Sequence, residues 1–153
     1  MEKYNLPACL NAQCIWIMRG YDRCRSEYLA ARRDIMTMGA QSFDESGVRT
    51  SSDGRSVEEV TAHLQALDNY PAFRQMFAVE HALDAVVENF PLTMRDRVKK
   101  ALMLSCKDGR VCPFERLDVP GVSRSGFYRL RRHVLYSIAE ELNLLPLSKN
   151  KRF

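Results

Sequence analysis

The N-terminal quarter of the chain carries apolar and polar residues in a helical pattern. Between residues 6 and 38, apolar or small residues recur at alternating spacings of four and three, with Pro7 near the first turn. We therefore predict one long amphipathic helix over residues 6–38. Residues 1–38 are expected to form one region that serves packing or oligomerisation. The apolar residues form a stripe along one side of this helix. The stripe could pack against another helix of the same chain or pair with a second copy, and the spacing does not distinguish the two because both require it. The stripe consists of Leu10, Cys14, Ile17, Tyr21, Cys24, Tyr28, Ala31, Ile35 and Met38.

The middle of the chain changes from a polar segment to two further helices. Residues 39–55 are rich in Gly, Ser and Asp and almost free of apolar residues, which is typical of a flexible linker. Residues 56–91 predict a helical connecting region that opens with Ser56 as N-cap and Glu59 completing a capping box. Pro71 suits the first turn of the second helix, expected over about residues 71–89.

A further helix is expected at about residues 93–106, with Thr93 as its cap. No strand-like alternation of useful length occurs anywhere in the sequence. The predicted fold class is therefore all-α, a helical bundle with a long N-terminal helix and a C-terminal helix-turn-helix within residues 92–145. Residues 146–153 are expected to form a basic tail.

The segment from residue 112 onward has the parts of a helix-turn-helix in order. Pro113 fits the first turn of a short helix that ends near Asp118, and Gly121 stands where a tight turn can need a positive φ. Val122 is expected to point inward and fix the angle between the helices, while Ser123 is a good N-cap for the second one.

The helix after Ser123 divides into two faces. Its apolar residues recur at spacings of three and four, so they share one side, which we expect to be packed on the preceding helices; they are Phe127, Leu130, Val134 and Ile138. The opposite side is expected to carry the polar and cationic residues Arg124, Ser125, Tyr128, Arg129, Arg131 and Arg132. These cluster in the first half of the helix, the half that enters the major groove in DNA-binding proteins of this kind.

Side-chain chemistry suggests a role for each candidate. Arg124 and Tyr128, with Ser125, are expected to face the floor of the groove, where arginine can make paired hydrogen bonds to guanine. The remaining cations are better suited to neutralise phosphates, namely Arg129, Arg131, Arg132, Lys107 and Arg110. The sequence thus predicts double-stranded DNA as the partner.

Charge and composition support this interpretation. Residues 1–94 hold 9 Lys/Arg and 13 Asp/Glu, whereas residues 95–153 hold 14 and 6, so the C-terminal part is strongly basic. A chain of 153 residues can hold one compact domain with an extension. The absence of a long apolar run and of a secretion signal indicates an intracellular protein without a membrane segment.

No feature of the sequence indicates catalysis or metal binding. The five cysteines are scattered and lack zinc-knuckle spacing, so free thiols are expected. His63, His81 and His133 fall on three different expected helices, and no Gly-rich phosphate loop or nucleophile elbow occurs. We therefore expect neither enzymatic activity nor a cofactor.

Residues 122–144, VSRSGFYRLRRHVLYSIAEELNL, resemble the C-terminal motif of the RinA/ArpU group of phage-encoded transcriptional regulators, whose helix-turn-helix is similar to region 4 of sigma-70 factors. The resemblance implies an activator of late phage genes in the cytoplasm of a bacterial host, associated with its nucleoid. It also implies host RNA polymerase as a partner, with a contact that no residue here locates, and DNA contacts at Ser123, Arg124, Ser125, Tyr128, Arg129 and Arg132.

Two other functions fit the same features. The small subunit of a phage terminase also combines a helix-turn-helix with helices that build a ring, and a ring of eight or more subunits would favour it. A protein-interaction module could instead present the basic helix to an acidic partner.

Overall fold

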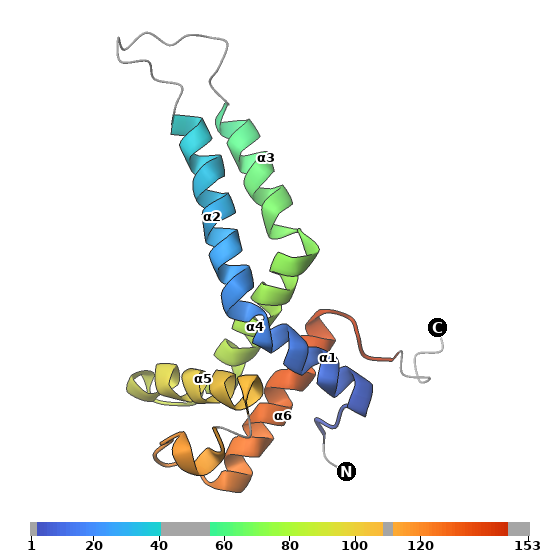
Figure 1. Ribbon diagram of the computed structural model, residues 1–153, viewed down its shortest axis with the longest axis vertical. Helices are drawn as coiled ribbons and strands as arrows, with labels where there is room; N and C mark the ends of the chain where they lie inside the picture. The colour runs from blue at the N-terminus through green and yellow to red at the C-terminus, as the bar shows by residue number, and fades with distance from the viewer. Residues whose placement is uncertain (1–2, 41–55, 109–111, 147–153) are drawn as a thin grey trace. The chain divides into compact units, whose positions relative to one another are not determined.

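The computed structural model describes residues 3–40, 56–108 and 112–146, without the side chains of residues 38–40 (Figure 1). Within these ranges the regular structure consists of six α-helices and one short 3₁₀ helix, with no strand. The expectation of an all-α protein is therefore confirmed. Most of the predicted linker at 39–55, Arg110, and all of the tail except Pro146 lie outside the described residues.

The single long N-terminal helix predicted for residues 6–38 is wrong. Two helices occupy this stretch, α1 (Ala8–Arg19) and α2 (Tyr21–Ala40), and Gly20 ends the first one. Glycine is among the poorest residues for a helix interior, because it loses the most backbone entropy on folding. The spacing of apolar residues runs straight through this break, so periodicity alone gave no sign of it.

The next two helices follow their local signals. Helix α3 (Val57–Asp68) begins after Ser56, whose side-chain Oγ accepts the backbone N–H of Glu59 at 3.2 Å, as the capping-box pattern predicts. Helix α4 (Pro71–Val87) begins at Pro71, the expected position, and ends two residues before the predicted boundary at 89.

Helix α5 (Leu92–Lys107) begins earlier than expected. Pro91 stands at its N-cap with no side-chain hydrogen bond, so the prediction of Thr93 as the cap is wrong. Pro91 has an extended backbone, with φ −54° and ψ 142°, and proline is well tolerated beside a helix start because it lacks the N–H that would need a partner there.

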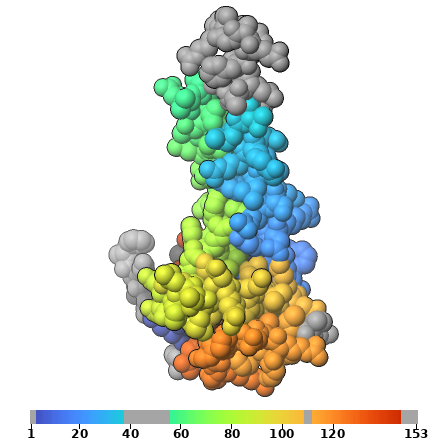
Figure 2. All heavy atoms as spheres, turned by 90° about the vertical axis from the view of Figure 1, so that its left-hand side faces the viewer, coloured from blue at the N-terminus to red at the C-terminus, as the bar shows by residue number. Residues whose placement is uncertain are grey.

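The described chain divides into two compact units, and each is described by itself. The smaller unit, Asp22–Arg74, contains most of α2 together with α3, which lie side by side (Figures 1 and 2). Tyr28 is buried there, donates a 2.7 Å hydrogen bond to the Asp68 carboxylate, and meets the Phe73 ring at a centroid distance of 5.3 Å. This hydrogen bond joins α2 to α3.

The larger unit joins residues 1–21 to residues 75–153, so α1 belongs with the C-terminal helices. Helix α1 packs against both α5 and α6 (Arg124–Glu141). Their interface is a continuous apolar core, whose largest fully buried side chains include Met18, Val98, Leu102, Phe127, Leu135 and Ile138. This core holds the first turns of α6 in place.

Both halves of the N-terminal stripe contain side chains that are buried within their own unit. Cys14 and Ile17 are buried in the larger unit, and Tyr28 is buried in the smaller one. The side chains therefore pack within the chain, which is one of the two uses that the spacing predicts. Pairing of two copies through this stripe stays a prediction.

Candidate nucleic-acid interface

The segment before α6 differs from the first helix of the predicted helix-turn-helix. Instead of a helix from Pro113 to near Asp118, it forms a three-residue 3₁₀ helix, η1 (Phe114–Arg116), and Pro113 is extended with ψ 161°. Asp118 adopts a positive φ of 46°, which ends the helical backbone two residues before Pro120. A residue that precedes proline disfavours the helical region, so the Val119-Pro120 pair helps to keep η1 short.

The turn between η1 and α6 has the predicted backbone. Gly121 has φ 79°, in the left-handed region that glycine adopts without steric cost. A Cβ at this position would meet no atom within 4 Å among the described residues, so the conformation, and not the available space, calls for glycine.

Helix α6 begins where its cap predicts. Ser123 is extended, and its Oγ accepts the backbone N–H of Gly126 at 3.1 Å. This bond satisfies one of the amide groups that a helix start leaves without a partner in the helix.

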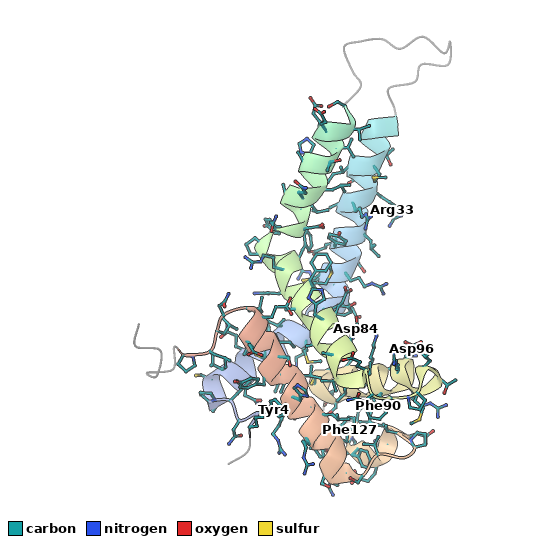
Figure 3. The ribbon with its side chains drawn as sticks, turned by 180° about the vertical axis from the view of Figure 1, so that it is seen from behind. Tyr4, Arg33, Asp84, Phe90, Asp96 and Phe127 are labelled. Carbon is teal, nitrogen blue, oxygen red and sulfur yellow. The ribbon has the colours of Figure 1, made fainter. Side chains whose placement is uncertain are left out.

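The apolar face of α6 is anchored as expected. Phe127, labelled on α6 in Figure 3, is fully buried. The centroids of the Phe114 and Phe127 rings lie 5.3 Å apart. Val134 and Ile138 are also buried, while Leu130 and Val122 pack at the edge of the core. The apolar residues in the second half of α6 indicate packing either in the core or against a partner, and two of them, Leu135 and Ala139, are buried in the core of the larger unit.

The first two turns of α6 present polar side chains to solvent. Ser123, Arg124, Ser125 and Arg129 are exposed. Tyr128 is half-buried and meets the Phe127 ring in an edge-on contact. Arg124 Nη1 lies 3.2 Å from Glu115 Oε1 of η1 in an ion pair whose side chains are both largely exposed. Pairs of this kind contribute little to stability, so the pair can open at small cost.

The remaining predicted cations are less accessible. Arg131 lies four residues after Phe127, at the edge of the buried face and not on the opposite side as expected. It sits beside the thiol of Cys106, where burial raises the pKa of Cys106 and the charge of Arg131 partly offsets that rise. Arg132 and Lys107 are half-buried, each with an interaction of its own.

The N-terminal segment covers part of the second half of α6, which no pattern in the sequence predicts. The Tyr4 ring stacks on His133 with centroids 4.2 Å apart, and it meets Tyr136 edge-on at 5.6 Å. Figure 3 shows Tyr4 at this helix. Burial, and then the charge of Lys3, lower the pKa of His133. The exposed polar face of α6 therefore ends near Arg132.

No family model, curated protein or solved structure matches the chain. No helix in the described ranges has the length and apolar character needed to cross a membrane. The described part of the chain also holds no group of three or more His, Cys, Asp or Glu side chains placed to hold a metal ion.

Proposed function

We propose that this protein binds double-stranded DNA and that the first two turns of α6 enter the major groove. The observation that carries the proposal is the contrast within these turns. Phe127 is fully buried and holds the helix rigidly, while Arg124, Ser125 and Arg129 are exposed around it. Exposed cations and hydroxyls on the first turns of an anchored helix are the features that recognition helices use.

In this proposal Arg124 contacts a base and Arg129 contacts a phosphate. Arg124 can leave its exposed pair with Glu115 and make paired hydrogen bonds to guanine O6 and N7. Ser125 and Tyr128 supply hydrogen-bonding groups on either side.

We further propose, from the resemblance of residues 122–144 to the RinA/ArpU group, that the DNA-binding activity serves transcription of phage genes in a bacterial cell. Host RNA polymerase is the partner that this role implies. Binding and regulation are separate claims, because the first is supported by the geometry of α6 and the second by the resemblance alone.

Selection of bound fragments from the source genome, followed by titration of one selected duplex, tests both the binding and its target. Arg124→Ala is expected to lower specific affinity by about 5- to 150-fold, equivalent to about 1–3 kcal/mol, and to relax preference at one base pair. Arg129→Ala is expected to weaken specific and random duplexes alike and to flatten the salt dependence.

Two controls separate these effects from a simple loss of charge. Arg74→Ala removes an exposed arginine from the smaller unit, and it should leave the affinity nearly unchanged. Glu115→Gln combined with Arg124→Ala removes the carboxylate that the single variant leaves without its partner. If Arg124→Ala loses the same affinity for specific and random DNA, its base-reading role is excluded. If the selection yields no bound fragment, the proposal of DNA binding is rejected.

A further inference from the structure

A pocket of about 290 Å³ opens where the N-terminal segment, α1 and α6 meet in the larger unit. Six residues line it, and they come from parts of the sequence more than 100 residues apart; they are Tyr4, Asn5, Leu6, Ala8, Asn11 and Arg132. The pocket therefore exists only in the folded unit.

The side chains around the pocket suit an anion that accepts hydrogen bonds. Arg132 supplies a guanidinium group, Asn5 and Asn11 supply amides, and Tyr4 supplies a phenol. None of the six lining residues is acidic, so the charge on the walls is positive. Arginine is the side chain that matches the oxygen atoms of a phosphate group best, because its planar donors can bind two of them.

Contacts outside the pocket fix the position of its walls. Tyr4 is held by its stacking on His133 and by its edge contact with Tyr136. Leu6 packs against the apolar core of the larger unit. The segment that closes the pocket is thus tied to α6 before any ligand arrives, which lowers the ordering cost of binding.

The position of the pocket along α6 connects it to the proposed DNA interface. Ser125, Arg129 and Arg132 follow one another at spacings of four and three, so their side chains are neighbours on one face of the helix. Because Arg132 lines the pocket and Arg129 is its neighbour on this face, a DNA strand that meets Arg129 can also bring a phosphate to the pocket.

We propose that this pocket binds one phosphodiester group of the DNA backbone, with Arg132 as its charged ligand and Asn5 and Asn11 as hydrogen-bonding ligands. The proposal rests on the DNA-binding function proposed above. In this proposal the N-terminal segment contacts DNA directly, because its residues and Arg132 bind the same phosphate. That contact helps to fix the position of α6 on the duplex.

The first test combines protein variants with single methylphosphonate substitutions in the selected duplex, each of which removes one phosphate charge. Arg132→Ala is expected to reduce the slope of log K against log salt by about one. Asn11→Ala is expected to lower affinity about 2- to 10-fold with the slope retained, as for loss of one hydrogen bond. The matched control is Asn89→Ala, an exposed asparagine of the same unit, which should bind as the wild type does.

One position of the methylphosphonate scan should weaken wild-type binding and have no effect on Arg132→Ala, because each change removes the same contact. If every sensitive position of the wild type stays equally sensitive in Arg132→Ala, the proposal is overturned. Equal affinities of Asn11→Ala and Asn89→Ala also overturn it. Circular dichroism of each variant checks that the helices are intact.

The second test uses inorganic phosphate without DNA. Titration of the isotope-labelled protein is expected to shift the side-chain NMR signals of Arg132 and Asn11, but not that of Asn89. Phosphate binding with no effect of Asn11→Ala on DNA affinity would mean that the pocket holds a free anion, contrary to the proposal. If the wild-type protein binds phosphate but no duplex, the proposed DNA-binding function is rejected. The assignment of a DNA phosphate as the ligand of the pocket is then rejected as well.

Discussion

Two glycines of the larger unit offer a direct measurement of the turn that precedes α6. Gly121 has a positive φ of 79°, whereas Gly20, at the end of α1, has φ −81° and ψ −4°. Neither position lacks room for a methyl group. A Cβ at Gly121 would meet nothing within 4 Å among the described residues, and one at Gly20 would lie 3.7 Å from the Ile17 carbonyl oxygen. Substitution by alanine therefore tests backbone conformation at both positions.

The expected magnitudes follow from one shared effect and one difference. Each Gly→Ala change stabilises by about 0.4–1 kcal/mol, because the unfolded chain loses conformational freedom. Alanine in the left-handed region costs about 1–2 kcal/mol, and only Gly121→Ala incurs this cost. We expect Gly20→Ala to be stabilising and Gly121→Ala to be less stable than it by about 1–2 kcal/mol.

Urea-induced unfolding, followed by the helical circular dichroism signal, gives the free energy of unfolding of each variant. Gly121→Asn serves as a further control, because asparagine tolerates a positive φ better than alanine and should recover part of the loss. If Gly20→Ala and Gly121→Ala have the same stability, the left-handed backbone at Gly121 is refuted, and with it the geometry of the turn into α6.

Two further predictions concern titratable side chains of the larger unit. Brief alkylation at pH 8, followed by mass spectrometry, should modify exposed Cys9 first and leave Cys14 and Cys106 unmodified until the protein unfolds. The reason is that burial raises the pKa of Cys14 to about 11 and also raises that of Cys106. Early labelling of Cys14 would contradict its burial in the core of the larger unit. The lowered pKa of His133 means that its contribution to stability is present above its ordinary value of 6.5 and is lost as the pH falls below it. His133→Gln should therefore flatten the dependence of stability on pH between 7.5 and 5.5, in contrast to the exposed control His63→Gln, and an unchanged profile would argue against burial of His133.

The covering of α6 by the N-terminal segment has a practical consequence for DNA-binding experiments. A fragment that begins at α5 would lack Tyr4, which stacks on His133, and would also lack α1, which buries part of the core. Such a fragment would expose Leu135 and Ala139, which are buried in the full chain. The full chain is therefore the appropriate material for every test described above.

Features that depend on a few neighbouring residues could be predicted from the amino-acid sequence. Ser56 and Ser123 cap their helices, Pro71 begins α4, and Gly121 has the positive φ that the turn requires. Each involves a hydrogen bond or a backbone restriction within about four residues, so residue type and spacing suffice to predict it. The all-α class follows in the same way, because helical periodicity extends over most of the chain.

Which helix faces pack against each other could not be predicted and is known from the folded structure. The apolar stripe of residues 6–38 is divided at Gly20, and its first half joins the core around Phe127. Arg131 lies against Cys106, and the N-terminal segment forms a pocket with Arg132. These arrangements depend on which of several apolar faces meet, and the faces look alike in the sequence because burial requires only apolar side chains of suitable size. The position of the first turns of α6 was thus predicted locally, whereas the limits of their exposed surface were set by contacts between residues far apart in the chain.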